Sequence, residues 1–278
     1  MKLSVIVTTY NRPDALKKVL QGLYAQTRLP DEILVADDGS TEDTRLVVSG
    51  FENRAGLKLS HVWQKDKGFR LSRIRNKAIS ASTGDYLVFL DGDCIPGPSF
   101  VEDHFRLARK GFFFQGKRVL VNQKAEQRFE FWDTQSIFRR VYHLVCRNVS
   151  NAHHLFRISF FPTWSTRKLS GIRGCNMGFF RQDLLDVNGY NESFTGWGRE
   201  DQEIVVRLYN LGVARRENPF NAICYHLWHR ENPRNRLSDN DRLLEKAMAA
   251  ESHVCRNGLK SLEQHGSLYD LNSSDTTE

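Results

Sequence analysis

The chain of 278 residues has few cysteines and no long apolar run. Its five cysteines are scattered and form no C-x-x-C pair, which argues against a disulfide framework or a zinc ribbon. No apolar run approaches the roughly 18 residues of a membrane span, and the run from Leu3 to Val7 is too short for a signal peptide. We therefore expect a cytoplasmic protein in a reducing compartment, and leave peripheral contact with the inner face of the cytoplasmic membrane open.

The excess of positive over negative charge is also small. Lys plus Arg is 40 against 33 Asp plus Glu, a net charge of +7, which is too mild for a histone-like protein but enough to favour anionic partners. With 40% apolar and 26% charged residues, the composition excludes a collagen-like or wholly disordered chain. Nucleotides, phosphorylated glycans and membrane surfaces all fit this charge.

The N-terminal part alternates apolar runs with helical patterns at the spacing of β-α-β units, which predicts a mostly parallel sheet covered by helices. Asn11 is positioned to cap the first helix, and Pro13 suits its first turn. No internal repeat and no obvious linker interrupts the chain. The predicted strands are 3–8, 32–36, 57–64 and 86–90, and the predicted helices are 13–24 and 71–81.

Short polar side chains cluster where three of the predicted strands end: Asn11, Asp37, Asp38, Asp91 and Asp93. Ligands of open α/β sheets sit beyond the carboxyl ends of the strands, so we expect these groups to converge. Asp91 and Asp93, at i and i+2, would lie about 6–7 Å apart on one face, a spacing that suits a divalent cation bridging to a diphosphate. Taken alone, Asp-Gly is also a favoured turn dipeptide.

Residues 117–173 combine positive charge with aromatic side chains. The segment holds eleven Lys and Arg against three acids, a net charge of +8. We expect its aromatic side chains to belong to the core of an ordinary subdomain, and its charge excess to serve function. The aromatic residues are Phe129, Phe131, Trp132, Tyr142, Phe156, Phe160, Phe161 and Trp164.

Two motifs in the C-terminal half carry further candidate ligands. His226 and His229 follow a predicted strand at 222–225, and imidazole with oxygen ligation suits Mn²⁺ better than Ca²⁺. The Gly-Trp-Gly-Arg-Glu-Asp run at 196–201 places Glu200 and Asp201 in the first turn of a predicted helix, 199–211, beside the ring of Trp197. Structural roles also explain these residues, since a lone histidine is more often structural and acids at a helix start complement its dipole by about 0.3–1 kcal/mol.

Taken together, these segments resemble the GT-A nucleotide-sugar glycosyltransferases of the inverting, family-two type. The segments that carry the likeness are 5–12, 37–40, 75–78 and the D-x-D of Asp91-Gly92-Asp93. Residues 173–177 and 196–201 resemble the acceptor half of β-galactosyltransferases and bacterial chondroitin polymerase. The resemblance implies an α/β protein with a GT-A (Rossmann-like) fold, a mostly parallel central sheet, a basic aromatic insert and a C-terminal helical appendage.

The resemblance also assigns roles to the residues that match the family's motifs. It implies that Asp93 is the main ligand of Mn²⁺ or Mg²⁺, joined by His226, with His229 as the fallback. It implies that Asp201 is the catalytic base, which removes a proton from the attacking hydroxyl, while Trp197 and Glu200 hold the acceptor sugar. The implied nucleotide-sugar-binding residues are Thr9, Asn11, Asp38, Arg75 and Asp91, with Asp38 at the uracil and Asp91 at the ribose and metal.

The function implied is metal-dependent, inverting transfer of a sugar from a UDP-sugar to a hydroxyl, which forms a β-linkage. Arg199 stands where related motifs often hold a small residue, a departure that bears on the acceptor. Because a neutral oligosaccharide would not need the cation excess of the insert, we expect an anionic or lipid-linked bacterial envelope glycan, of the lipopolysaccharide core or capsule type. The alternative is a non-catalytic protein that binds anionic glycan or nucleic acid through the insert, although we do not expect a nucleic-acid partner.

The expected organisation is a glycosyltransferase domain at 1–237, a helical appendage at 238–262 and a disordered tail at 263–278. Within the domain, 1–116 forms the nucleotide-sugar-binding half and 117–237 the acceptor-binding half. The sequence leaves the oligomeric state open.

Overall fold

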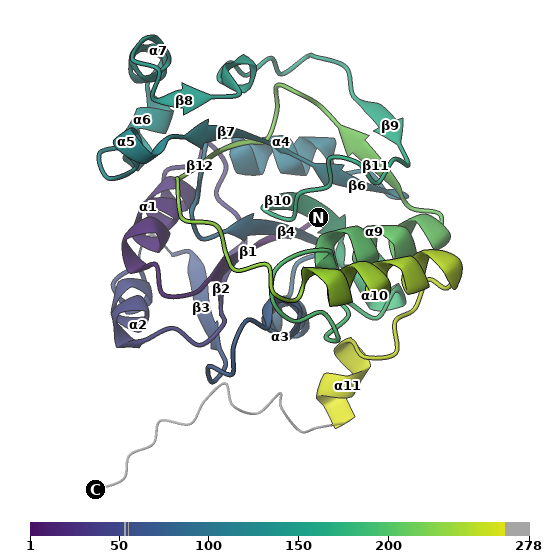
Figure 1. The fold of residues 1–278 in the computed structure, drawn as a ribbon. Helices are drawn as coiled ribbons and strands as arrows, with labels where there is room; N and C mark the ends of the chain where they lie inside the picture. Colours follow the sequence, from purple (N-terminus) through teal and green to yellow (C-terminus); the bar gives the residue numbers. More distant parts are fainter. Residues whose placement is uncertain (53, 55, 265–278) are drawn as a thin grey trace, which may run out of the picture.

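The computed structural model describes residues 1–52, 54 and 56–264, and an eight-stranded, mostly parallel sheet runs through its centre (Figure 1). The strand order is β3-β2-β1-β4-β10-β6-β11-β9. The strands β3, β2, β1 and β4 run parallel to one another, and β10 runs antiparallel to its neighbours β4 and β6. These strands are β1 Leu3–Thr9, β2 Glu32–Asp37, β3 Lys58–Trp63, β4 Tyr86–Asp91, β6 Phe112–Gln115, β9 Trp164–Thr166, β10 Asn176–Phe180 and β11 Ala214–Glu217. The predicted α/β class and parallel sheet are confirmed, and the four predicted N-terminal strands lie within a residue of their expected ends.

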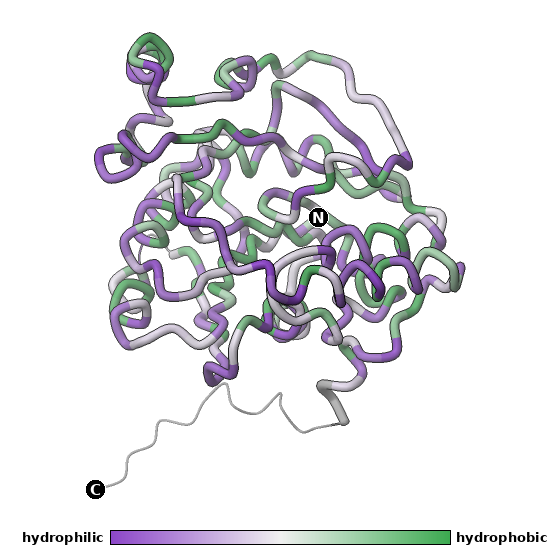
Figure 2. Tube along the Cα trace, in the orientation of Figure 1, coloured by the Kyte–Doolittle hydropathy of each residue, from purple (hydrophilic) through white to green (hydrophobic). Residues whose placement is uncertain are grey.

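The alternation of side chains along β1 explains why the sheet has a core on each face. Leu3, Val5 and Val7 pack in one cluster with α1 (Pro13–Tyr24), while Ile6 belongs to a second cluster with residues of α3 (Leu71–Ala81) and α9 (Glu200–Asn210). Successive strand residues face opposite sides, and a strand covered on both faces reads as one apolar run. Figure 2 shows the resulting hydrophobic interior.

The remaining helices cover the sheet and its edges, and Pro13 starts α1 as predicted. The predicted cap is wrong: the Asn11 side chain accepts a hydrogen bond from the Thr41 amide at 2.9 Å, and Arg12 takes the cap position. The other helices are α2 Glu42–Ser49, α4 Phe100–Leu107, α5 Gln123–Glu126, α6 Phe131–Gln135, α7 Ile137–Val145, η1 Ala152–His154, α8 Arg181–Asp186, α10 Leu237–Ala249 and α11 Leu259–Gln264.

A second sheet, of four strands, brings the C-terminal histidines to the D-x-D segment. Its order is β5-β12-β7-β8, and β12 pairs antiparallel with β5 so that His226 lies opposite Cys94. The amide of Leu227 also donates to the carbonyl of Asp93 at 2.8 Å. The strands are β5 Cys94–Pro96, β7 Lys117–Val121, β8 Val149–Ser150 and β12 Ile223–His226.

The expectation that the aromatic side chains of 117–173 form a core is wrong for most of them. Phe129 is buried against the main core, but five others are exposed, because the short helices α5, α6 and α7 extend from one corner of the molecule rather than closing over a core of their own (Figure 1). The exposed aromatic residues are Trp132, Tyr142, Phe156, Phe160 and Trp164.

The C-terminal helices pack on the domain. In α10, the Asn240 side chain donates to the carbonyls of Thr195 and Gly198 at 3.2 and 2.9 Å, and α10 lies along α9 (Figure 1). Leu259, in α11, belongs to the second core cluster. From residue 265 on, the predicted disordered tail lies outside the described residues. Within those residues, no helix combines the length and the apolar character that crossing a membrane requires.

Candidate active site

A cavity of about 910 Å³ opens where the polar ends of the strands meet the first turn of α9. Its wall includes Thr8 and Thr9 of β1, Asp91 and Asp93 at the end of β4, Glu200 and Asp201 of α9, and the two histidines that end and follow β12. Ten of the eleven site residues predicted from the sequence line it; Asn11 does not. The fold therefore assembles one site from segments that are far apart in the chain.

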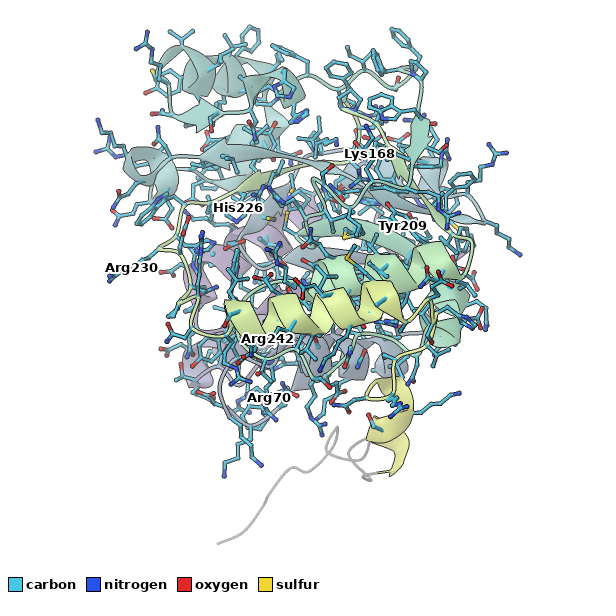
Figure 3. The ribbon with its side chains drawn as sticks, turned by 45° about the vertical axis from the view of Figure 1, so that its right-hand side comes forward. Arg70, Lys168, Tyr209, His226, Arg230 and Arg242 are labelled. Atoms are coloured by element: carbon cyan, nitrogen blue, oxygen red, sulfur yellow. The ribbon has the colours of Figure 1, made fainter. Side chains whose placement is uncertain are left out.

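One end of the cavity holds the three side chains predicted to bind a metal. One ligand atom from each of Asp93, His226 and His229 lies within 4.8 Å of the others. The Nε2 atoms of His226 and His229 are 3.7 and 3.4 Å from the Asp93 carboxylate. Figure 3 shows His226 above α10 in the interior, while Arg230 extends outward. Both histidines, rather than one of them, face the aspartate.

The donor set of this cluster fits a divalent cation. His229 Nδ1 donates to the carbonyl of Arg230 at 2.8 Å, which leaves Nε2 as the ring nitrogen that faces Asp93. Burial lowers the pKa of His226, which favours its neutral, ligating form. One carboxylate and two imidazoles suit Mn²⁺. Arg12 donates to the Asp93 carboxylate at 2.8 Å and supplies a positive charge at the same point.

A second group of acids in the cavity is organised by Arg75, whose side chain is 1% exposed. Its Nη1 atom donates to Asp201 Oδ1 at 2.8 Å and lies 3.8 Å from Glu200, while Nη2 is 3.7 Å from Asp91. Asp91 also accepts a hydrogen bond from the Thr8 hydroxyl at 2.9 Å. Arg75 lines the cavity, as predicted for a nucleotide-binding residue, but its charge is directed at three carboxylates.

Asp201 is held in one orientation from two sides. Besides Arg75, the backbone amide of Gly174 donates to Asp201 Oδ2 at 2.9 Å. A Cβ atom at position 174 would lie 2.1 Å from this oxygen, so only glycine permits the approach. Each carboxylate oxygen keeps a further lone pair for another donor. Asp201, which is 21% exposed, therefore presents a fixed acceptor to the cavity.

The neighbouring Glu200 differs from Asp201 in its surroundings. Burial raises its pKa to about 7, with a smaller upward contribution from the charge of Asp201 and a downward one from Arg75. Trp197 is 39% exposed, and the Arg234 guanidinium lies 5.0 Å from the centre of its ring. Arg199 pairs with Asp241 of α10 at 2.5 Å. The unusual arginine of the Trp-Gly-Arg-Glu-Asp segment thus anchors α10 beside the cavity.

Polar groups at the ends of β1 and β2 also line the cavity. The Thr9 hydroxyl is buried and has no hydrogen-bond partner among the described residues. Asp38 accepts hydrogen bonds from Gln64 Nε2 at 2.6 Å and from the Arg70 amide at 2.7 Å, and burial raises its pKa. Both groups therefore meet the cavity with hydrogen-bonding capacity left.

Sequence reasoning did not assign some of the residues that line or shape this site. Arg12, Arg118 and Arg173 bring three cations to the cavity. The guanidinium of Arg118 lies 3.7 Å from the Cys175 sulfur, and the pKa of Arg118 is raised by nearby cysteines although burial opposes this. Arg12 and Arg173 belong to the quoted segments 5–12 and 173–177 but were given no role there, whereas nothing in the local sequence of Arg118 points to the site.

Comparison with known proteins shows the family to which this chain belongs. A model of glycosyl transferase family 2 matches residues 4–169, which is more than half of the chain. The protein belongs to glycosyl transferase family 2. A model described as the N-terminal domain of galactosyltransferase matches residues 158–230, the part that carries Glu200, Asp201 and His226. The glycosyltransferase implied by the resemblance is confirmed, and family membership favours it over a non-catalytic binding protein.

Curated relatives agree with this family. The chain is 28% identical to a chondroitin synthase of Escherichia coli over 90% of its own length and 37% of that protein's length. It is 30% identical to a validoxylamine A glucosyltransferase of Streptomyces hygroscopicus subsp. limoneus and to a hyaluronan synthase of Pasteurella multocida, over 76% of this chain in each case and 48% and 23% of theirs. The chain thus spans less than half the length of these relatives.

Solved structures support the fold. Staphylococcus aureus TarS 1–349 superposes with a TM-score of 0.61 at 20% identity, covering 90% of this chain and 68% of that one. The same fragment in complex with UDP-GlcNAc gives 0.62 at 19% identity, covering 90% of this chain and 69% of that one. The GT-A fold of this family-2 protein is therefore shared with TarS.

Proposed function

We propose that this family-2 protein transfers a sugar from a UDP-sugar to a hydroxyl of an anionic bacterial envelope glycan, with a divalent cation and with inversion at the anomeric carbon. The observation that carries the proposal is one cavity whose wall includes both the Asp93, His226 and His229 cluster and Asp201. A leaving diphosphate and an attacking hydroxyl need these two kinds of group on opposite sides of the sugar.

The donor half of the cavity suits a nucleoside diphosphate. Thr9 brings an unpaired buried hydroxyl and Asp38 a carboxylate, while Arg12 adds a cation beside Asp93. The titles of the TarS complexes name UDP and UDP-GlcNAc as ligands of that protein, which supports a UDP-sugar for this one. In this assignment Asp93, His226 and His229 would hold Mn²⁺ or Mg²⁺, which when bound neutralises charge on the departing UDP.

The acceptor half provides the base. The acceptor oxygen forms its bond to the anomeric carbon as the bond from that carbon to the β-phosphate oxygen breaks, and the electron pair leaves on UDP. The proton of the hydroxyl moves to a carboxylate oxygen of Asp201, which Arg75 and Gly174 hold in place. A single displacement inverts the anomeric centre, so an α-linked UDP-sugar gives a β-glycoside.

The charge of the acceptor side supports an anionic acceptor. Arg118 and Arg173 line the cavity, and the segment 117–173 has a net charge of +8. Phosphate or carboxylate groups on a lipopolysaccharide core or capsular glycan would meet these cations. Trp197, next to Glu200 on the same wall, offers a ring for the apolar face of the acceptor sugar.

The test incubates the protein with Mn²⁺ and a panel of UDP-sugars, with and without lipopolysaccharide core or capsular oligosaccharides. UDP release is measured, and the anomeric configuration of the product is read by proton NMR. We expect metal-dependent release with one donor, stimulated by an anionic acceptor, and a β-linked product. A retained α-configuration, or release unaffected by removing the metal, would contradict the proposal.

A further inference from the structure

Helix α7 (Ile137–Val145) carries an apolar face that the rest of the protein leaves uncovered. Phe138 is 84% exposed, Val145 74% and Tyr142 60%. The helix lies at the outermost corner of the molecule, and Figure 2 shows hydrophobic residues on it. A contiguous exposed apolar patch, unlike scattered single residues, marks an interaction site.

The exposed side chains form one stripe rather than a scatter. At about 100° per residue, Ile137, Phe138, Val141, Tyr142 and Val145 fall within an arc of about 140°, and all five are exposed. His143, on the opposite side, is buried against Phe129. The helix is therefore amphipathic with its apolar face outward, the reverse of a helix that covers a core.

A second segment extends the apolar surface along the same edge. Phe160 is 89% exposed and Phe156 is 43% exposed, and both belong to the stretch between η1 and β9 that runs along the top of Figure 1 with α7. Arg140 of α7 donates to the carbonyl of Leu155 at 2.9 Å, which joins the two segments.

Positive charge surrounds this apolar surface. The three acids of 117–173 are already paired, Glu126 with Arg12, Glu130 with Lys18 and Asp133 with Arg139. Lys117 and Arg157 pair with acids outside the segment, Glu217 and Asp103. Lys124, Arg128 and Arg147 are exposed and form none of the ion pairs found among the described residues.

Exposed cations also flank α7 in the chain. Arg147 is held beside α5 because its carbonyl accepts a hydrogen bond from Asn122 at 2.7 Å, and Lys124 and Arg128 are exposed in and just after α5. The surface thus combines exposed Phe, Tyr and Val side chains with flanking Arg and Lys.

We infer that α7 and the segment 156–164 form a peripheral membrane-binding surface that recognises anionic phospholipid. Apolar side chains enter the boundary between head groups and acyl chains, while flanking Lys and Arg side chains contact acidic head groups. A second copy of the chain is a poorer match, since it would place two cationic surfaces against each other. The inference goes beyond the proposed transfer and stands without it.

The position of the surface leaves the cavity free. The helix leads into β8, and β8 and the histidine-bearing strand β12 flank β7 in the four-stranded sheet. Two strand spacings, about 10 Å, separate β8 from β12. Phe138, Val145 and Phe160 do not line the cavity, so changing them leaves the site residues intact.

The test measures sedimentation of the full chain with vesicles of phosphatidylcholine alone and with added phosphatidylglycerol, at low and high salt. We expect binding that requires phosphatidylglycerol and weakens with salt. Phe138→Ser/Val145→Ser should lower the partition constant by about tenfold or more, and Lys124→Glu/Arg147→Glu should remove the preference for phosphatidylglycerol.

The matched control is Leu46→Ser/Met248→Ser, which removes two exposed apolar side chains from α2 and α10 and should leave partition unchanged. Thermal unfolding checks that each variant folds. No binding to phosphatidylglycerol vesicles, or equal losses in the control, would overturn the inference. Sedimentation analysis showing a dimer that Phe138→Ser/Val145→Ser dissociates would also overturn it, in favour of a second copy as the occupant.

Discussion

Two groups of acids in the cavity, Asp201 at the start of α9 and Asp93 after β4, differ in how the protein itself satisfies them. At the α9 end, Asp201 receives hydrogen bonds from Arg75 and Gly174, and the cation is fully buried. At the β4 end, Asp93 faces two histidines and the partly exposed Arg12. The protein itself supplies the hydrogen-bond donors of Asp201. Asp93 and the two histidines instead offer ligand atoms to a metal ion, which is not part of the chain.

The difference matches the two tasks of a glycosyltransferase. A base acts best when its position is fixed before the acceptor arrives, which a buried ion pair achieves. A diphosphate and its cation must enter and leave in each cycle, which requires accessible ligands. Changes at the α9 end should therefore affect turnover or folding, and changes at the β4 end should affect metal and donor binding.

The largest expected effect is that of Asp201→Asn. The amide can still accept from Arg75 but cannot take the proton of the hydroxyl, so we expect turnover to fall by about 10²–10⁴-fold. Steady-state rates of UDP release with acceptor measure this, with Asp239→Asn, an acid in the first turn of α10 that does not line the cavity, as the matched control. Turnover within twofold of the parent would remove Asp201 from the role of base.

Arg75→Leu should have the largest effect on stability. It leaves Asp91, Glu200 and Asp201 facing one another without their cation, and breaking a buried ion pair costs about 3–5 kcal/mol. Urea unfolding measures the free energy of unfolding. The control Arg45→Leu removes an exposed partner of Glu42 and should cost about 0–1 kcal/mol. Equal losses in both variants would show that Arg75 does not organise this end.

The two histidines test the β4 end. Because both face Asp93, we expect His226→Ala and His229→Ala each to weaken Mn²⁺ binding by about tenfold or more. Calorimetric titration of Mn²⁺ measures this without any turnover, and His153→Ala, at an exposed histidine, is the control. If Mn²⁺ binding weakens in only one of the two variants, the metal site would contain a single histidine, either His226 or the fallback His229.

A smaller effect is expected from the pH dependence of stability. The raised pKa of Glu200, about 7 against 4.5, means that the folded protein binds more protons than the unfolded chain between these values. Stability should therefore fall as the pH rises from about 4.5 to 7, by on the order of 1–3 kcal/mol for this group. Glu200→Gln should flatten that part of the profile, and the exposed control Glu245→Gln should not. An unchanged slope in Glu200→Gln would contradict the pKa.

Much of the fold can be predicted from the sequence because each strand and helix is specified by residues close together in the chain. The apolar run of β1 and the helical spacing after Pro13 were sufficient to predict those elements. Asp93 follows a predicted strand and Asp201 lies at the start of a predicted helix, so local sequence also pointed to these two site residues.

The parts that the sequence did not reveal depend on partners far along the chain. Arg75 and Asp201 are 126 residues apart and Arg12 and Asp93 are 81 apart, and no local pattern encodes either pair. The same limit explains why the aromatic residues of 117–173 were misjudged. Whether Tyr142 or Phe160 is covered depends on what packs over it, which composition does not reveal.

The central claim is that the cavity divides into a donor-holding end and an acceptor-activating end. The most direct test is calorimetric titration of UDP into the parent, Asp93→Asn and Asp201→Asn proteins, each with and without Mn²⁺. We predict that Mn²⁺ tightens UDP binding in the parent and in Asp201→Asn, and that Asp93→Asn loses this gain. Equal loss of the Mn²⁺-dependent gain in both variants, or no gain in the parent, would contradict the division.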